Sequence, residues 1–383
     1  MLRFLTAGES HGPALTVILE GLPAGIPIRS KKIIDEMARR RLGYGRGPRM
    51  RFEQDRLEII GGVRHGFSLG SPIALVIHNS EWNKWERVMS PEEGPAGNVL
   101  TEPRPGHADL SGMLKYDRED ARDILERASA RETAARTAAG AIAKTLLNEL
   151  AIAIVSHVVA IGDVEAASGP VPLPADIETI DASPVRCFDP SAETKMIAAI
   201  EAAGSDGDSL GGIIEVIAYD LPPGLGSHVH WDRRLDAEVA RAMMSIPAIK
   251  AVEIGDGFAV AKLRGSVAHD EIFFEDGRFI RHTDRAGGTE GGMSIGGTLR
   301  VRAAMKPLST LKRPLRTVDV NTKEQVSAFK ERTDVCAVPA AAVVGEAVIA
   351  LAIAGSIIEK FGGDSLGDLK GSYERYMHRV AER

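Results

Sequence analysis

The chain has 383 residues, which is enough for one large domain or two ordinary ones. Its net charge of -6 at pH 7 argues against a general nucleic-acid-binding protein, because such proteins carry a positive surplus. The two cysteines, Cys187 and Cys336, lie far apart without the spacing of metal ligands, which argues against a disulfide framework and favours a reducing cytoplasm. The N-terminal residues lack the length and the apolar core of a signal peptide.

Hydrophobic periodicity predicts a mixture of strands and helices along the chain. The expected strands cover residues 15–19, 57–63, 73–77, 152–161, 213–218 and 299–304. The expected helices cover residues 30–41, capped by Ser30, then 120–151, 191–203 and 231–245, with a last large helix from about Pro339. Residues 162–188 contain several prolines and small residues and are expected to form a loop.

One segment, residues 335–358, is mostly Ala, Val and Ile and has the length of a membrane span. It contains Pro339 and Glu346, and much of its bulk is Ala. These features favour a helix buried in the core, so no membrane association is expected.

Two stretches of sequence suggest an internal duplication. Residues 19–25 and residues 219–224 each form a strand end and a Leu-Pro-x-Gly turn before a helix. A strand, a Gly-rich connection and another strand follow each helix, which predicts two related β-α-β-β halves. The simpler explanation is that such turns are common. No linker separates the halves, so residues 1–383 are expected to form a single domain.

Residues 39–51 carry six arginines, three glycines and no lysine within thirteen positions. The planar guanidinium group grips carboxylate and phosphate in two-pronged fashion, and glycine lets the backbone approach a ligand closely. This arginine loop therefore predicts a site for a compact polyanion. The alternatives are a solvated basic loop or a nucleic-acid patch, although only Tyr44 and Phe52 are near enough to stack on bases.

Two histidines lie in glycine-rich turns, His11 within residues 8–12 and His107 within residues 104–109. Each is a candidate general acid or base, and the neighbouring Glu9 and Asp109 could orient them. A lone histidine is more often structural, so each signal is weak by itself. The chain has no H-E-x-x-H pattern and no cysteine pair, so no metal site is expected.

Glycine-rich stretches at residues 205–212, 255–258 and 285–297 could cradle phosphate through backbone N–H groups. None matches the Walker A or the G-x-G-x-x-G pattern, and tight turns explain the glycines equally well. Asp334 precedes the last large helix, where it is either a helix cap or a buried acid with a chemical role.

Taken together, these segments resemble the chorismate synthase family over nearly the whole chain. The matching motifs occur in order at residues 8–12, 40–47, 104–109, 126–134, 206–212, 248–258, 306–310 and 332–339. One departure is Thr333, where the family often has Ser.

The resemblance implies an α/β (α+β) fold of the β-α-β sandwich type, with helices flanking mostly antiparallel sheets, and usually a cytoplasmic homotetramer. It implies a lyase that eliminates phosphate from 5-enolpyruvylshikimate 3-phosphate in an anti-1,4 fashion and gives chorismate, the last common step of the shikimate pathway. Reduced FMN is required without net redox change. NADPH is expected only as an indirect reductant, since no flavin-reductase domain is visible.

The resemblance also assigns roles to residues. His11 would protonate the departing phosphate, His107 would protonate or stabilise reduced flavin, and Asp334 would help to deprotonate flavin N5. The groups that would hold the anionic substrate or NADPH are Arg40, Arg46, Arg49, Arg104 and Arg131. Flavin contacts would come from Arg127, Ala128, Ser129, Pro247, Ala248, Gly291, Lys306, Pro307, Leu308, Ser309, Thr310 and Arg332.

Two other functions fit parts of the sequence. A nucleic-acid-binding protein could use the arginine loop, and it would bind random oligonucleotides with a steep salt dependence. An ordinary flavin oxidoreductase could use the glycine-rich loops, and it would oxidise NAD(P)H in step with product formation.

Overall fold

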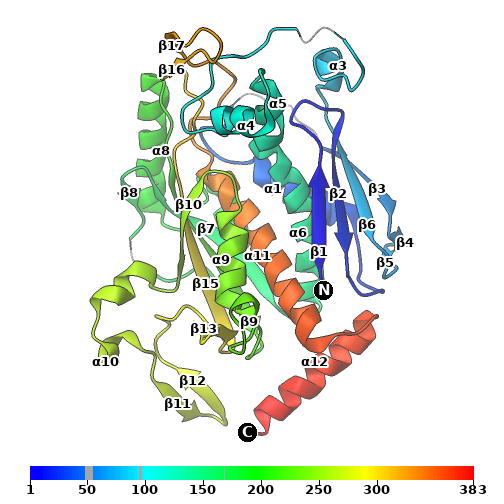
Figure 1. Cartoon of the computed structure of the whole chain (residues 1–383). Helices are drawn as coiled ribbons and strands as arrows, with labels where there is room; N and C mark the ends of the chain where they lie inside the picture. The colour runs from blue at the N-terminus through cyan, green and yellow to red at the C-terminus, as the bar shows by residue number, and fades with distance from the viewer. Residues whose placement is uncertain (48–54, 95–96, 168) are drawn as a thin grey trace.

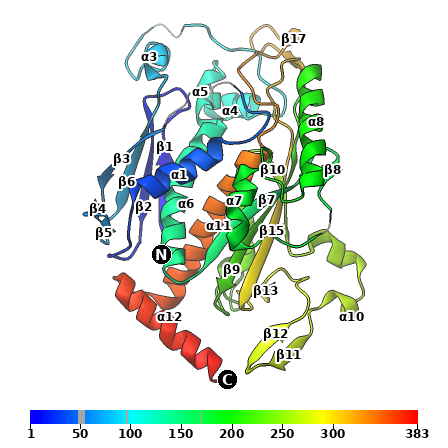
Figure 2. The same ribbon diagram turned by 180° about the vertical axis from the view of Figure 1, so that it is seen from behind.

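The computed structural model describes residues 1–47, 55–94, 97–167 and 169–383. Two antiparallel sheets form the outer layers and long helices lie between them, as Figure 1 and the reverse view in Figure 2 show. The expected mixture of helices and sheets is confirmed.

The first sheet has the strand order β1-β2-β6-β3. It is built from β1 (Arg3–Ala7), β2 (Ala14–Glu20), β3 (Arg56–Gly61) and β6 (Ile73–His78). Along β2 the side chains alternate, so that Leu15, Val17 and Leu19 are buried while Ile18 is exposed on the outer face. A short ribbon of β4 (Val63–Arg64) and β5 (Phe67–Ser68) connects β3 to β6.

The second sheet has the order β10-β15-β9-β7-β8. Its strands are β7 (Ala153–Ile161), β8 (Val164–Glu165), β9 (Gly212–Leu221), β10 (Ile249–Ile254) and β15 (Gly297–Met305). Its strands β7, β9, β15 and β10 follow one another in the same spatial order as β1, β2, β6 and β3. A helix also follows β9 in the chain, as one follows β2.

Four helices fill the space between the sheets, namely α1 (Ser30–Arg41), α6 (Thr133–Asn148), α9 (Leu235–Met244) and α11 (Val338–Phe361). Helices α1 and α6 cover the first sheet, α9 and α11 cover the second, and α6 packs directly on α11. Helices α6 and α11 cross so closely that a Cβ atom added at Gly140 would collide with Ala347. Small residues therefore set the spacing of the two central helices.

Helix α11 is, among the described residues, the helix that is long and apolar enough to cross a membrane. Its most apolar stretch is 83% buried inside the fold. The expected core helix is therefore confirmed.

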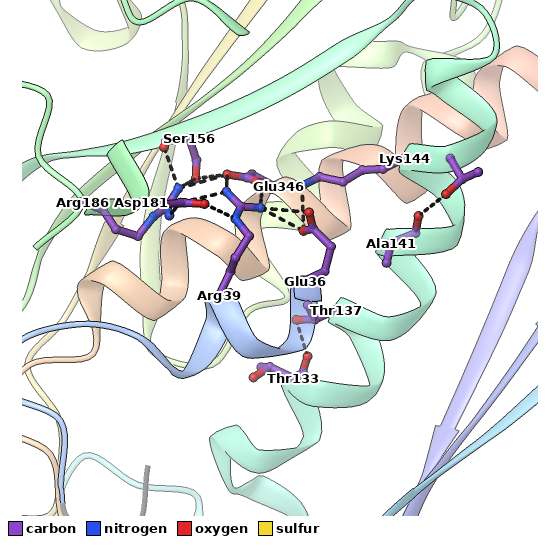
Figure 3. A network of polar contacts seen from close by, with 11 residues as sticks. Glu36, Arg39, Thr133, Thr137, Ala141, Lys144, Ser156, Asp181, Arg186 and Glu346 are labelled. Atoms are coloured by element: carbon purple, nitrogen blue, oxygen red, sulfur yellow. Dashed lines mark hydrogen bonds and ion pairs between the residues drawn. The ribbon is translucent and has the colours of Figure 1, made fainter. Parts of the chain in front are cut away.

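A buried ionic network ties α1, α6 and α11 together (Figure 3). The Glu346 carboxylate of α11 accepts from Arg39 Nη1 at 2.7 Å and from Arg186 Nη2 at 3.2 Å, and it is paired with Lys144. Although burial opposes ionisation, these cations hold the pKa of Glu346 well below its usual range. Asp181 accepts from Arg39 Nε at 2.6 Å, so the C-terminal end of α1 is anchored on both sides.

The remaining elements gather at the two ends of the layers (Figure 1). One end carries α3 (Trp82–Trp85), α4 (Asp109–Tyr116), α5 (Arg122–Ala128), η1 (Ala130–Glu132), β16 (Arg316–Val318) and β17 (Gln325–Ser327). The other end carries α10 (Gly265–Ala268), the hairpin of β11 (Ile272–Glu275) and β12 (Arg278–Arg281), the short pair β13 (Thr289–Glu290) and β14 (Met293–Ser294), and α12 (Leu366–Ala381). Helix α8 (Pro190–Asp206) packs beside β7 and β8.

The prediction of one helix over residues 120–151 is wrong. The helix stops at Ser129, whose ψ of 142° is extended and whose Oγ accepts from Arg131 N at 3.3 Å. The Ser-x-x-Glu pattern at residues 129–132 is a helix-start signal that could have located this break. The break matters because it separates α5 from α6 and brings residues 128–131 to the surface of a cleft.

Three smaller predictions also need correction. Ser30 does not cap α1, because it is the first helical residue and the N-cap position, Arg29, makes no side-chain cap. The expected loop at residues 162–188 contains β8 and a short helix, α7 (Ile177–Ala182). The helix expected over residues 231–245 begins only at Leu235, after the turn η3 (Trp231–Arg233).

Candidate active site

A cleft of 490 Å³ brings together seven segments that are distant in the chain. They are the turn after β1, the C-terminal end of α1, the turn before α4, the break between α5 and α6, the α9–β10 junction, the end of β15 and the approach to α11. The predicted site residues that line it are His11, Arg40, Arg46, Arg104, His107, Ala128, Ser129, Arg131, Pro247, Ala248, Lys306, Leu308, Ser309, Thr310, Arg332 and Asp334.

Other predicted residues lie elsewhere. Pro307 is not among the lining residues, although its neighbours on both sides are. Arg127 points to β1 instead, where it donates to Thr6 O at 2.9 Å and Gly8 O at 3.1 Å. Arg49 lies outside the described residues.

Gly291 is also remote from this cleft. The turn that contains it lies at the N-terminal end of α9, because Leu235 N donates to Gly292 O at 2.8 Å. The cleft residues Pro247 and Ala248 follow the C-terminal end of the same ten-residue helix, which spans about 15 Å.

His11 is held by Glu126, not by Glu9 as expected. His11 Nδ1 lies 2.9 Å from Glu126 Oε1, and the His11 backbone N–H donates to Glu126 Oε2 at 2.8 Å. Burial opposes ionisation of Glu126, but hydrogen bonds from His11 and the charge of Arg122 lower its pKa. Sequence reasoning missed Glu126 because its partner is 115 residues away, with no local pattern linking them.

His107 is held by Asp109, as expected. The fully buried Asp109 carboxylate pairs with His107 Nδ1 and accepts from Arg104 Nε at 2.8 Å. Burial works against its ionisation, but the hydrogen bonds from His107 and Arg104 lower the pKa of Asp109 to about 2. Arg104 Nη1 also donates to Thr310 Oγ1 at 2.8 Å, which ties the turn before α4 to the segment after β15.

Asp334 lies in the cleft and does not cap the last large helix. Its Oδ1 accepts from Gly47 N at 2.6 Å, and its Oδ2 lies 3.0 Å from Arg46 Nη1. Helix α11 begins at Val338 without a side-chain cap, so the capping alternative for Asp334 is wrong. The carboxylate instead fixes Arg46 and Gly47 against the approach to α11.

Arg40 is 3% exposed although it lines the cleft, and its Nη1 reaches Thr133 Oγ1 at 3.4 Å. A guanidinium group held this deeply meets little competing water, so its attraction for an anion is stronger than at a surface. Arg131 is similarly buried and forms an ion pair with Asp55.

The lining around Lys306 combines polar and apolar groups. Lys306 Nζ donates to Ser309 Oγ at 2.9 Å, and Ser309 Oγ donates to Gly106 O at 2.8 Å. Burial lowers the pKa of Lys306. Beside it, Ala248 has a φ of +70°, a conformation that costs a non-glycine residue about 1–3 kcal/mol and that clusters at functional sites.

The lining as a whole has a cationic surplus. Among the described residues of the lining there are six cations, against the two carboxylates of Glu331 and Asp334. The cations are Arg40, Arg46, Arg104, Arg131, Arg332 and Lys306. Two oriented imidazoles lie among these charges. Within the described part of the chain, no group of three or more His, Cys, Asp or Glu side chains could hold a metal ion. The arrangement can bind a compact polyanion and move protons at its edge.

A second cavity of 820 Å³ lies on the other side of α5 and is larger. Its arginines Arg87, Arg118, Arg122 and Arg127 are matched by five carboxylates, and no histidine is among the described residues that line it. Size alone therefore does not select the active site, and the smaller cleft has the chemistry.

The fold and the cleft together are those of an enzyme that acts on a small molecule. The sequence profile of chorismate synthase matches residues 2–358. The chain is 59% identical to a chorismate synthase of Leifsonia xyli subsp. xyli, an alignment that covers 100% of this chain and 97% of that protein. It is 58% identical to a chorismate synthase of Salinispora tropica, with 100% of both chains covered.

A solved structure agrees with these relatives. A crystal structure of chorismate synthase superposes with a TM-score of 0.81 at 42% identity and covers 100% of this chain and 99% of that one. The chain belongs to the chorismate synthase family, and the resemblance inferred from its motifs is confirmed.

Proposed function

We propose that this chain is a lyase that eliminates phosphate from 5-enolpyruvylshikimate 3-phosphate and gives chorismate, with reduced FMN as an obligatory cofactor. The observation that carries the proposal is that His11, His107, Arg40 and Arg46 line one cleft. Membership of the family supports the reaction, and the chemistry of the cleft supports the assignment of its residues.

The substrate has a phosphate and two carboxylates, and the arginines of the cleft suit all three groups. Arg40 and Arg131 are buried, so their charges act in a medium of low effective dielectric. Guanidinium groups can also meet each anion with two parallel hydrogen bonds. Arg40 and Arg46 are proposed to bind either this substrate or NADPH. Both ligands are anionic, so each assignment requires the same fixed cations.

The elimination breaks the bond between the ring carbon and the phosphate oxygen and removes a ring hydrogen on the opposite face. His11 is the proposed acid, which gives a proton to the departing phosphate and makes it a better leaving group. One positioned acid typically accelerates such a step by about 10²–10⁴-fold. Asp334, held by Gly47 N–H and Arg46, is the proposed group that would help to deprotonate flavin N5.

The cleft also has groups that suit a flavin. Ala128, Pro247, Ala248 and Leu308 provide an apolar wall for a planar ring, and the lysine and hydroxyls of residues 306–310 lie beside it. When bound, reduced FMN supplies electron density to the substrate and recovers it, so there is no net redox change. His107, with Nδ1 held by Asp109, is proposed to protonate or stabilise the reduced cofactor. Flavin contacts from Arg127, Pro307 and Gly291 stay predictions.

The proposal includes the state of the protein. The matching strand orders of the two sheets support an internal duplication of one β-α-β-β unit. The proposed homotetramer would cover apolar side chains that are exposed on the outer face of the first sheet and on the hairpin, such as Leu5, Ile18, Phe274 and Phe279. A cytoplasmic location is also proposed, and the two buried cysteines, which form no disulfide, are consistent with it.

An anaerobic turnover assay tests the proposed function. The protein is mixed with the substrate and either reduced FMN, oxidised FMN, oxidised FMN with NADPH, or no flavin, and phosphate, chorismate and the NADPH consumed are measured. Equal amounts of both products with reduced FMN alone support the lyase. No phosphate release would rule out the lyase. One NADPH consumed per product formed would favour an oxidoreductase instead.

A further inference from the structure

The contacts around His11 assign a role to a residue that the reaction chemistry does not itself require. We propose that Glu126 is the positioning residue of His11: it fixes the tautomer with the proton on Nδ1 and turns Nε2 toward the cleft. This inference rests on the proposed function of His11 as the acid at the phosphate.

The side chain and the backbone carbonyl of Glu126 both hold the turn that contains His11. Its Oε1 and Oε2 lie 2.9 and 3.0 Å from His11 Nδ1, and Oε2 also accepts from the His11 backbone N–H at 2.8 Å. Its backbone carbonyl accepts from Ser10 N at 2.9 Å. The imidazole cannot rotate about its side-chain bonds without losing the bond to a carboxylate that is 1% exposed.

A second contact fixes the plane of the ring. Trp85 stacks on the His11 imidazole, with ring centroids 3.9 Å apart and planes inclined by 23°. Arg122 connects the two supports, since its Nη1 donates to Glu126 Oε1 at 3.1 Å and its guanidinium carbon lies 5.1 Å from the Trp85 ring. The ring of His11 is therefore restrained both along its edge and across its face.

The chemistry of the pair selects one tautomer. An ionised carboxylate has no hydrogen to donate, so His11 Nδ1 must be the donor in this contact. The lowered pKa of Glu126 keeps the carboxylate ionised at neutral pH. As the acid, His11 is the doubly protonated imidazolium: it gives up the proton on Nε2, the nitrogen on the far side of the ring from Glu126, and is left as the neutral tautomer with its proton on Nδ1. A glutamine at residue 126 could donate or accept, and this selection would be lost.

The test uses Glu126→Gln in the full-length protein, with Glu215→Gln as the matched control. Glu215 forms a similar buried pair with His157, at 2.9 Å from Nε2, and does not line the cleft. Ring-nitrogen NMR of protein with ¹⁵N-labelled histidine, assigned with His11→Gln, reports which nitrogen carries the proton and needs no substrate. Turnover is measured anaerobically in parallel.

We expect Glu126→Gln to change the protonation pattern of the His11 ring and to lower kcat by about 10–100-fold with little change in KM, the range typical when an orienting partner is lost. Glu215→Gln should leave the protonation pattern of the His11 ring and kcat unchanged. Glu126→Asp keeps the charge, so it should retain the tautomer and recover part of kcat. If Glu126→Gln does not fold, loss of the Nδ1–H tautomer in Glu126→Asp would overturn the proposal. An unchanged tautomer or an unchanged kcat in Glu126→Gln would overturn the proposal. If Glu126→Gln changes the tautomer but the wild-type protein releases no phosphate, the proposed function is ruled out while the positioning role of Glu126 stands.

Discussion

Arg39 and Arg40 are consecutive residues of α1, yet their side chains belong to different parts of the molecule. Arg39 joins the buried ionic network through Glu346 and Asp181, while Arg40 lines the cleft. Consecutive side chains of a helix point about 100° apart, so one anchored arginine sets the direction of the next. The network in Figure 3 therefore fixes a cation of the proposed site without contacting the site itself.

The first prediction concerns this network. Glu346→Gln keeps the shape of the side chain but leaves Arg39, Lys144 and Arg186 facing a neutral group. Removing one partner of a buried ion pair typically costs about 3–5 kcal/mol, which urea denaturation would measure as a loss of unfolding free energy. The exposed pair Arg3–Glu20 provides the control, because Glu20→Gln should cost no more than about 1 kcal/mol. Equal stabilities of the two variants would contradict the anchoring role.

The two histidines of the cleft are expected to be catalytic. His11→Ala and His107→Ala should each lower kcat by at least about tenfold, because each removes a positioned proton donor or acceptor. Circular dichroism should show an intact fold in both. The exposed His230, paired with Asp232, serves as the control, and His230→Ala should turn over normally. Near-normal turnover of either cleft variant would show that its assigned role is wrong.

Asp334→Asn separates a structural role from a chemical one. The asparagine oxygen can still accept from Gly47 N, whereas the charge that pairs with Arg46 and the capacity to take up a proton are lost. We expect kcat to fall by at least about tenfold while the thermal midpoint changes little. A fall in stability with unchanged kcat would favour a purely structural carboxylate.

Asp109 predicts a pH dependence of stability. Its pKa is lowered in the folded protein to about 2 from 3.8, so its ionised form contributes stability that is fully present above about pH 4. This contribution is lost as the pH falls from about 4 to about 2. Asp109→Asn should therefore be less stable than the wild type at pH 7, and the difference should shrink at pH 3. A difference in urea midpoint that is constant over this range would contradict the lowered pKa.

The chemistry of the site could be predicted from residue types, whereas its assembly could not. Arg40, Arg46, His11 and His107 were recognisable because arginine and histidine in glycine-rich turns have distinctive chemistry. Their meeting in one cleft depends on packing between distant segments, which no local pattern encodes. The role of Glu126 was also not predictable from a local pattern, since Glu126 reaches His11 only in the folded chain.

The fold was predictable where side chains alternate between core and solvent. Strand β2 and helix α1 were located within a residue because their buried positions recur at the strand and helix periods. Helix α12 was missed because Leu369 is its one buried residue, and the hairpin strand β11 was missed because all its residues are exposed. The break at Ser129 was missed because the surrounding residues favour a helix, and a serine cap overrides that preference.

The most direct test of the account is a crystal structure of the protein with 5-enolpyruvylshikimate 3-phosphate and FMN bound. We predict that the substrate lies in the 490 Å³ cleft, with its phosphate at hydrogen-bond distance from His11 and its carboxylates against arginines of the lining. The flavin ring should lie along Pro247, Ala248 and Leu308. A substrate bound in the second cavity, or on a surface remote from His11 and Arg40, would contradict the central claim.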